Sequence, residues 1–524
     1  MLASRGAPLA LAGLAVATWL SIGPVSVTSS SLIATAAQNQ LVGAAALAHW
    51  RLLETARLLP TDAFPQSLDA DGNWVTTGPG GWTCGFLPGS LWLSYEQTLD
   101  PAVLSAAQAR LQPLLSQETN TTTHDLGFMM DNSFGNAYRL TGNDTYRQAV
   151  VSAARSLATR YSPIVGAIRA WNDPTDFLVI VDTMVNAELL LWAADHGGDP
   201  AWRSMAIQHG LTTARLLVHA DGSVIHQARL DPSTGALRTV TNAWTGLPDS
   251  ATWARGASWA MHGYTALYAR TRDPRFLAVV RSLADHFVAH VPDNDVSQVW
   301  LETPPGGSRP DSSATAVASA ALGRLATLDP DARRRAGYAA AARRYLAVLT
   351  SPAFLDTTAG GAALLRHGSV GLVDAGTSWG DYYLLEAIER HRLLPPASPP
   401  LALTGATASS NDGNVPANVL DGDVATRWSA YGSGQWLQVV LATPQPVHAV
   451  SVTWLAGAAR SARFRIDTWT STRGWIPAVT AATTGWSAGE ETYDLRPRAA
   501  AAVRITGFGS TQSLWTSINE VRVR

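Results

Sequence analysis

Residues 177–192, FLVIVDTMVNAELLLW, place one carboxylate, that of Asp182, in the middle of an apolar run. The run begins with β-branched residues and passes into helical periodicity after Asp182. Burying an unpaired carboxylate is costly, so Asp182 must be hydrogen-bonded, ion-paired or protonated. Two interpretations follow. Asp182 is either the N-cap of a helix that begins at Thr183, or a catalytic acid or base whose pKa is raised by desolvation.

The overall composition narrows the classes of function. A chain of 524 residues is long enough for two or three domains. Its formal charge of −2 gives no basic surface for nucleic acid, so we expect no nucleic-acid partner. The 20 tryptophans suit sugar stacking, although core packing explains them equally well. A single cysteine, Cys84, excludes an intrachain disulfide.

Residues 1–36 have the pattern of a secretory signal peptide. Arg5 precedes an apolar core over residues 8–23, and ATA at residues 34–36 fits a small-x-small cleavage site. The apolar core is short for a membrane span, and no later stretch qualifies as one. We therefore expect a secreted, extracellular protein with no membrane attachment once the signal is removed. An uncleaved anchor is the alternative.

Residues 37–394 show helical periodicity in twelve segments. Turn and cap residues separate several of them, such as TGND at residues 141–144 and GGDP at residues 197–200. Short connections alternate with long ones, which is the pattern of helical hairpins. Six hairpins predict an (α/α)6 barrel whose long loops shape a cleft at one end. The segments are 40–59, 88–98, 101–117, 127–141, 143–160, 179–196, 199–219, 252–271, 273–290, 312–327, 330–349 and 378–393.

The pattern changes after a proline-rich linker at residues 395–402. From there the hydrophobic period is two rather than 3.6, which indicates strands. Residues 403–524 therefore predict an all-β jelly-roll sandwich, so the chain has two domains. The expected strands are 435–441, 447–454, 463–469, 502–508 and 518–524.

Two glycine-bearing clusters lie early in the helical domain. In GGWTCGFLPGSLW, residues 80–92, the glycines permit close backbone approach, and Trp82 and Phe86 could form an apolar wall. In THDLGF, residues 123–128, a second carboxylate, Asp125, stands beside His124 at the start of a helix. Asp125 is either an N-cap or a catalytic group.

Two further candidates lie later in the same domain. In DSATWARGASW, residues 249–259, Arg255 and Trp259 are four residues apart on one helical face, where a cation and an aromatic ring could hold an anionic sugar. The alternative is a buried arginine that satisfies backbone carbonyls. His226 lies in a long loop, where a structural role is the alternative to substrate contact.

Two carboxylates in semi-buried settings are the pattern that glycoside hydrolases use for acid and base catalysis. Asp182 and Asp125 fit that pattern, although the sequence does not give the distance between them. The helical domain has no metal-ligand spacing, no phosphate-binding glycine loop and no nucleophile elbow. We therefore expect no cofactor for catalysis.

Several motifs in residues 40–393 resemble glycoside hydrolase family 88, the unsaturated glucuronyl hydrolases. The family implies an (α/α)6 barrel that acts on the unsaturated uronic acid left at a non-reducing end by a polysaccharide lyase. Members protonate carbon 4 of the 4,5-double bond and direct water to carbon 5, and the resulting hemiketal collapses to release the remaining sugar. The motifs are GGWTCGFLPGSLWLSYE, THDLGF, FLVIVDTMVNAELLLWAAD, DSATWARGASWAMHGY, RPDSSATAVASAALGRL and SWGDYYLLEAI.

The resemblance also implies roles for individual residues. Asp182 matches the general acid/base, and Asp125 matches the second essential carboxylate. An apolar surround would keep Asp182 protonated, as protonation of a vinyl ether requires. A uronate carboxylate would pair with a nearby arginine or histidine. The positions that match substrate contacts or lie beside them are Trp82, Phe86, His124, His226, Arg255 and Trp259.

One segment departs from the family pattern. Members usually carry a THQGY-like motif just before the DSATWARG-like motif, whereas residues 241–248 here read TNAWTGLP. The family's glutamine contact has no counterpart in this segment, which affects substrate preference. We expect Trp244 to take its place as a stacking surface.

The second domain resembles the discoidin-like family, also called carbohydrate-binding module family 32. The matching text is NVLDGDVATRW at residues 418–428, QWL at 435–437 and INEV at 518–521. The family implies a bound glycan polymer and often a structural calcium, which takes hard oxygen ligands. The alternative is a turn capped by its own aspartates. The expected ligands are Asp421, Asp423, Thr426 and Glu520; Trp428 and Trp436 are expected in the core, and Tyr431, Trp475 and Trp515 in glycan-binding loops.

The sequence therefore predicts a secreted hydrolase that removes 4,5-unsaturated glucuronic acid from lyase-generated oligosaccharides, with a glycan-binding module attached. An unsaturated galacturonyl or rhamnogalacturonyl hydrolase is one alternative, but such enzymes generally rely on one of the two aspartates. A catalytically inactive glycan-binding scaffold is another, and retention of both Asp125 and Asp182 argues against it.

Overall fold

The computed structural model describes residues 29–303, 307–396 and 398–524, with the backbone alone for residues 29–38. The expected signal peptide, residues 1–36, thus lies outside the described residues except for the backbone of its last eight, which begins helix α1 (Ser29–Leu58). Across the described ranges, no helix has both the length and the apolar character needed to cross a membrane.

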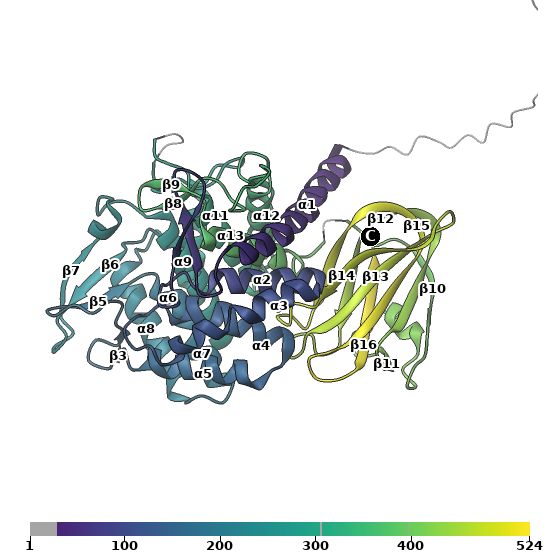
Figure 1. Cartoon of the computed structure of the whole chain (residues 1–524), viewed down its shortest axis with the longest axis horizontal. Coiled ribbons are helices and arrows are strands. Elements are labelled where there is room, and N and C mark those ends of the chain that lie inside the picture. Colours follow the sequence, from purple (N-terminus) through teal and green to yellow (C-terminus); the bar gives the residue numbers. More distant parts are fainter. Residues whose placement is uncertain (1–28, 304–306, 397) are drawn as a thin grey trace, which may run out of the picture.

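The N-terminal two thirds of the chain is an α/α barrel (Figure 1). Each of the twelve expected segments contains a helix, although the segment 179–196 begins as a strand. Helix α11, rich in Ala, Ser and Thr, is buried almost throughout and packs against α9, α12 and α13, because small side chains let neighbouring helices approach closely. Besides α1, the helices are α2 (Phe86–Thr98), α3 (Pro101–Ala109), η1 (Gln112–Thr119), η2 (Gly127–Gly135), α4 (Asn136–Thr141), α5 (Asp144–Ala158), α6 (Thr183–Asn186), α7 (Glu188–Asp195), α8 (Ala201–Leu217), α9 (Ala254–Thr271), α10 (Pro274–His290), α11 (Ser312–Leu328), α12 (Ala332–Leu349) and α13 (Ser378–His391).

The prediction of one helix is partly wrong, and the strand found in its place positions Asp182. The segment expected as a helix over 179–196 begins as strand β5 (Phe177–Ile180) and turns into α6 and α7 only after Asp182. The β-branched run that ends at Val181 favours a strand. Strand β5 pairs with β6 (Gln227–Leu230), which pairs with β7 (Leu237–Thr241). This three-stranded sheet lies at the end of the barrel farthest from the sandwich in Figure 1.

The other long barrel loops carry short hairpins. β1 (Phe64–Leu68) pairs with β2 (Trp74–Thr77), β3 (Tyr161–Ser162) with β4 (Ala167–Ile168), and β8 (Gly368–Val370) with β9 (Val373–Ala375). A short 3-10 turn, η3 (Ala243–Thr245), follows β7. The backbone of these loops is therefore partly held by the hydrogen bonds of the hairpins.

The C-terminal domain is a β-sandwich built on two long, bent strands. The first part of β12 (Gln435–Trp454) pairs with β10 (Leu403–Ala408), and its second part pairs with β16 (Trp515–Val523). The strands expected at 435–441 and 447–454 are therefore one strand, with an irregularity in its pairing to β15 between Val440 and Gln445. The remaining elements are η4 (Pro416–Leu420), β11 (Trp428–Tyr431), β13 (Ala462–Thr470), β14 (Gly474–Ala482) and β15 (Glu490–Ser510).

The tryptophans of the sandwich divide between core and surface differently from the sequence expectation. Trp428 is fully buried in the sandwich core, as expected. Trp436 is only partly buried, because alternation along β12 sends Leu437 inward and its neighbour outward. Trp475 lies on strand β14 rather than in a loop.

The two domains are joined by direct contacts. The guanidinium of Arg390 lies 3.7 Å from the ring centroid of Trp486, which packs on the barrel core. Arg139 donates a hydrogen bond to the Thr484 carbonyl, and the Thr492 amide donates one to the carbonyl of Arg392. The sandwich is therefore packed on the barrel as well as tethered by the linker.

Candidate active site

Asp182 lies two residues after the end of strand β5, and its carboxylate faces a histidine. Its Oδ2 lies 3.2 Å from Nδ1 of His226, although the two atoms are not aligned as a hydrogen bond. The Val181 amide donates to the His226 carbonyl over 3.0 Å, which extends the β5–β6 pairing and brings the two side chains together. Asp182 occupies the N-cap position of α6, as one interpretation expected, but its side chain makes no capping hydrogen bond, so capping does not account for the carboxylate.

The electrostatic surroundings of Asp182 differ from the expectation of a protonated acid. Burial is the largest influence and raises the pKa of this carboxyl. The contact with His226 and the electrostatic influence of His226, His124 and Arg255 together outweigh burial, so the pKa lies below its ordinary value. The prediction of a raised pKa is therefore wrong for the protein without substrate, because an apolar sequence does not show which charges fold onto it.

Asp125 forms a second carboxylate–histidine pair. Its Oδ1 lies 3.3 Å from Nε2 of His124, and its Oδ2 accepts a hydrogen bond of 2.8 Å from the Thr123 hydroxyl. The helix that follows, η2, has Leu126 at its N-cap position and no side-chain cap. Asp125 is therefore not an N-cap, and its side chain keeps 14% of its surface exposed, as does that of Asp182.

His124 links the two carboxylate segments. Its Nδ1 lies 3.0 Å from the hydroxyl of Thr183, the residue after Asp182, while its Nε2 faces Asp125. Burial, the largest influence, lowers the pKa of His124, which favours the neutral imidazole. With the proton on Nε2, that ring accepts from Thr183 and presents an N–H to Asp125.

Gly127 allows the two segments to pack this closely. A Cβ at Gly127 would lie 2.6 Å from the Cα of Asn186, so a larger residue would push the segments apart. The Asn186 side chain also accepts a hydrogen bond of 2.8 Å from the amide of Phe128. The glycine of THDLGF thus fixes the position of Asp125 relative to the Asp182 segment.

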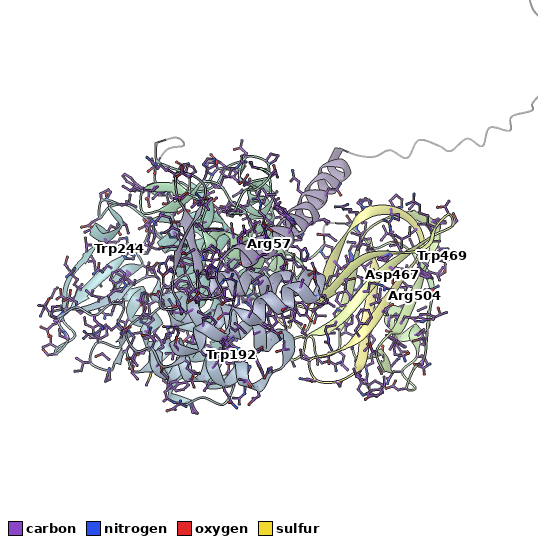
Figure 2. The ribbon with its side chains drawn as sticks, in the orientation of Figure 1. Arg57, Trp192, Trp244, Asp467, Trp469 and Arg504 are labelled. Atoms are coloured by element: carbon purple, nitrogen blue, oxygen red, sulfur yellow. The ribbon has the colours of Figure 1, made fainter. Side chains whose placement is uncertain are left out.

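Aromatic rings surround the Asp182–His226 pair. Trp244 stacks on the His226 ring, with centroids 5.1 Å apart and planes at 22°. Trp171 lies 5.4 Å from Trp244, and Trp253 meets His226 edge-on at 5.3 Å. Trp244 is 60% exposed and projects at the sheet end of the barrel in Figure 2. The TNAWTGLP segment therefore places an open indole face beside the carboxylate.

The altered segment is anchored by Asn242. Its buried side chain accepts a hydrogen bond of 2.8 Å from the His226 amide and donates to the carbonyls of Pro248 and Ala251. Asp249 accepts the Asn242 amide. Trp244 is thus held by a network that also contacts the backbone of His226.

Arg255 is enclosed by protein groups. It is 5% exposed, donates to the Ser369 carbonyl and lies 3.8 Å from the buried carboxylate of Asp311. Its guanidinium packs over Trp253 at 4.7 Å and over Trp379 at 5.0 Å. The interpretation of a buried arginine that satisfies a carbonyl therefore describes its contacts, while its charge still acts on Asp182.

Two of the expected substrate contacts belong to the core. Phe86 and Trp259 are 0% and 1% exposed and pack against Phe128, at 5.6 Å and 4.9 Å between ring centroids. Their faces are covered, so the expectation that they contact a sugar is corrected. Trp82 is partly exposed and lies 5.0 Å from Trp379.

Several residues at the site were missed by sequence reasoning. Trp253 and Trp379 lie inside the quoted DSATWARG and SWGDYY motifs, so their positions in these motifs could have identified them. Trp171 lies outside every quoted segment, and Asn242 lies in the quoted TNAWTGLP segment, where only Trp244 was expected to act; the fold shows the place of both. Thr183 was considered only as the first residue of a helix.

The expected calcium ligands come together in the sandwich. The Thr426 hydroxyl contacts Asp421 Oδ2 at 2.7 Å and the Asp423 carbonyl at 3.0 Å. Glu520 accepts the Gly422 amide, and burial followed by the nearby negative charge of Asp421 helps raise its pKa. Asp421 and Asp423 also cap their own turn through backbone amides. Over the described ranges no cluster holds three or more His, Cys, Asp or Glu side chains at metal spacing, so a cation would rest on two carboxylates and neutral oxygens.

The barrel, with two partly exposed carboxylates and an open aromatic face at one end, defines a glycoside hydrolase type of site. Comparison with known proteins supports that class. The unsaturated glucuronyl hydrolase of Formosa agariphila is 34% identical over 345 residues, which are 63% of this chain and 85% of the relative. The unsaturated chondroitin disaccharide hydrolase of Streptococcus pyogenes is 33% identical over 62% of this chain and 85% of its own length. The chain belongs to the unsaturated glucuronyl hydrolase family, and it is an enzyme.

Solved structures agree with this assignment. The crystal structure of an unsaturated glucuronyl hydrolase specific for heparin covers 68% of this chain and 97% of that chain, with 31% identity and a TM-score of 0.65. The enzyme from Bacillus sp. GL1 superposes over the same share, with 30% identity and a TM-score of 0.62. Residues 405–521 match the F5/8 type C domain family. The α/α barrel and the discoidin-like sandwich predicted from the sequence are therefore confirmed.

Proposed function

We propose that Asp182 and Asp125 are the catalytic pair, acting on 4,5-unsaturated glucuronic acid at the non-reducing end of lyase-generated oligosaccharides. The observation that carries this proposal is the single linked arrangement of two partly exposed carboxylates, each facing a buried histidine, with His124 in contact with both segments. Asp182 is the acid/base. Asp125 is the second carboxylate and is connected to it through His124 and Thr183.

The reaction adds water across a carbon–carbon double bond. A proton from the Asp182 carboxyl goes to carbon 4, the water oxygen bonds to carbon 5, and the water's proton returns to Asp182. The hemiketal at carbon 5 then opens, and the glycosidic bond breaks to release the remaining sugar. Because the free carboxyl has a lowered pKa, substrate must raise it. The uronate carboxylate supplies a like charge and the sugar displaces water, and both effects raise a carboxyl pKa.

Substrate recognition follows from which groups remain open. The guanidinium of Arg255 already donates to the Ser369 carbonyl. We therefore assign it the role of lowering the pKa of Asp182 by its charge, rather than a bidentate contact with the substrate. Trp244 offers an exposed face beside His226 and fits the apolar face of a sugar ring. Trp82 is a second partly exposed ring. We place the unsaturated sugar between the carboxylates and Trp244.

Loss of the ultraviolet absorbance of the unsaturated uronide tests the function directly. A panel of lyase-generated disaccharides from hyaluronan, chondroitin and heparin is incubated with the full chain and with Asp182→Asn. Asp173→Asn is a matched control, because that carboxylate caps its own turn at Thr175 in the loop before β5. We expect loss of absorbance with the wild type and the control only. Full activity in Asp182→Asn contradicts the mechanism, and unchanged absorbance in every wild-type reaction contradicts the substrate class.

We infer that the sandwich binds a glycan and that its turn at residues 421–426 holds a structural calcium. The carboxylates of Asp421 and Glu520, the Thr426 hydroxyl and the Asp423 backbone carbonyl fit a hard cation, whose charge would offset the two neighbouring carboxylates. Chelation by EGTA is expected to lower the melting temperature of the wild type, and Glu520→Gln to remove that response. A melting temperature that EGTA does not change contradicts the calcium site.

We also propose export from the cell. The proposal is supported by the order of Arg5, the apolar core at residues 8–23 and the ATA segment at residues 34–36. Expression of the full chain and sequencing of the N-terminus of the extracellular protein tests it. A mature chain that begins near residue 37 is expected, and retention of Met1 in a cell-associated protein contradicts it.

A further inference from the structure

The outer face of one sheet of the sandwich carries an unusual set of side chains. Strands β12, β15, β13 and β14 lie side by side in that order. Leu437, Val503 and Ile466 on these strands point into the sandwich core. Because side chains alternate along a strand, Trp436 and Arg504, next to them in sequence, point outward.

Strand register brings the outward residues into adjacent rows. Arg504 on β15 pairs with Gln438 on one side and with Asp467 on the other. In the next row, Trp469 on β13 pairs with Trp475 on β14, and their rings meet edge-on with centroids 5.4 Å apart. Trp469 is 38% exposed. The face therefore presents neighbouring indoles beside a central arginine.

The guanidinium of Arg504 lies close to two indole rings. Its guanidinium carbon lies 4.3 Å from the ring centroid of Trp436 and 4.1 Å from that of Trp475. Its Nη2 donates to Gln438 over 3.1 Å, while its Nε is buried and has no hydrogen-bond partner among the described residues. Cation–π contact with two rings restrains the guanidinium, which is the polar feature of this aromatic surface.

The surface has a net positive character. Asp467 is 3% exposed and accepts a hydrogen bond from Arg465 Nε at 3.0 Å, so this arginine offsets its charge. Arg504 makes no ion pair within 4.0 Å in the part of the chain that the structure describes. A ligand on this face would thus meet aromatic surface and one uncompensated, orientated guanidinium.

We propose that this face, defined by Trp436, Trp469, Trp475, Arg465 and Arg504, binds an acidic polysaccharide, with sugar rings stacked on the indoles and a carboxylate or sulfate at Arg504. The proposal rests on the proposed glycan binding of the sandwich and names its site and ligand class. Arginine suits carboxylate and sulfate oxygens, and indoles suit the apolar faces of pyranose rings. Four strands give a face roughly 14 Å across, which suits an extended chain better than an isolated sugar.

The position of this face assigns it a role separate from the active site. Trp244 lies at one end of the longest axis of the molecule, and Trp469 and Arg504 lie near the other (Figure 2). A short oligosaccharide in the barrel therefore does not reach the sandwich face. The face instead holds the parent polymer, which keeps the enzyme near the place where a lyase releases its substrates.

Affinity electrophoresis of the full chain tests the proposal. Native gels contain hyaluronan, which carries carboxylates, chondroitin sulfate, which also carries sulfates, or neutral dextran. We expect both acidic polymers, but not dextran, to retard the wild type, and added salt to weaken the effect. Trp469→Ala and Arg504→Gln are each expected to weaken binding about tenfold. Arg504→Lys, which keeps the charge but loses the flat fork, is expected to be intermediate.

Tyr431→Ala separates this face from the glycan contact that the sequence suggested at Tyr431. Tyr431 is 60% exposed and packs against Trp515 elsewhere on the sandwich, so its loss should leave binding unchanged. Hydrolysis of unsaturated disaccharides by Trp469→Ala should equal that of the wild type, which separates this proposal from the proposed catalytic function. Equal retardation by dextran, unchanged binding in folded Trp469→Ala, or loss of binding in Tyr431→Ala alone would overturn the proposal.

Discussion

Asp182 and Asp125 are two carboxylates that each face a histidine but lie in different surroundings. Each faces a buried histidine, at 3.2 Å for Asp182 and 3.3 Å for Asp125, and each side chain is 14% exposed. Asp182 lies two residues after strand β5, faces the histidine on which Trp244 stacks, and is near positive charges that lower its pKa. Asp125 precedes a helix and accepts the Thr123 hydroxyl. Both carboxylates are thus positioned by a histidine, and the charges around them make their properties differ.

Replacing each carboxylate in turn tests this difference with the largest effect. Asp182→Asn removes the group that exchanges protons with carbon 4 and with water, so we expect kcat to fall by about 10³-fold or more. Asp125→Asn keeps that group and is expected to lower kcat by about 10²-fold. Steady-state kinetics on one unsaturated disaccharide gives both values. Equal losses would show that the two carboxylates act as one unit and would remove the distinction drawn here.

The pH dependence of activity tests the influence of His226 on Asp182. His226 helps to lower the pKa of Asp182 through direct contact and charge. In His226→Gln the charge is lost, so the pKa of Asp182 should rise. Because the reaction begins with a proton from the Asp182 carboxyl, activity falls as pH rises through that pKa, so the alkaline limb of kcat/KM should move to higher pH. Asn242→Ala, which loses the hydrogen bond to the His226 amide but keeps the imidazole, is the control. A limb that stays in place or moves to lower pH in His226→Gln contradicts the assignment.

Much of the architecture follows from local pattern. Twelve periodic segments and their caps predict the helical hairpins; for example, the side chains of Asn143 and Asp273 cap α5 and α10 as their positions before a helix suggest. The change of period at the linker predicts the sandwich. These features depend on residues close in sequence, so a single sequence carries them.

The site depends on contacts between distant residues, which periodicity does not encode. Residues 124 and 183 are 59 positions apart, yet their contact links the two carboxylates. The apolar text around Asp182 predicts a raised pKa, whereas folding brings His226, His124 and Arg255 near it and reverses the direction. Phe86 lies in a motif of the family but packs in the core. Motif membership thus locates the region of the site without showing which side chains are open.

A smaller effect is expected where the two pairs are joined. Thr183→Val keeps the shape of the side chain and removes the hydroxyl that contacts His124 Nδ1 at 3.0 Å. Loss of one such hydrogen bond costs about 1 kcal/mol, so we expect kcat to fall about fivefold. Thr183→Ser, which keeps the hydroxyl, is the matched control and should retain most activity. A Val variant as active as the Ser variant would show that the two pairs work independently.

The smallest expected effect concerns the indole of Trp244, which stacks on the histidine that faces Asp182. Trp244 is 60% exposed and stacks on His226, so it is positioned to cover a bound sugar without touching the proton that moves. In Trp244→Ala we expect KM to rise several-fold, with kcat nearly unchanged, because lost stacking weakens substrate and transition state alike. Trp50→Ala, at a tryptophan 51% exposed on α1, controls for the loss of a surface indole. An unchanged KM for every unsaturated disaccharide contradicts the stacking role. A large fall in kcat would instead show that Trp244 orients His226, and the two carboxylate pairs would then differ in how their histidines are held as well as in their charge.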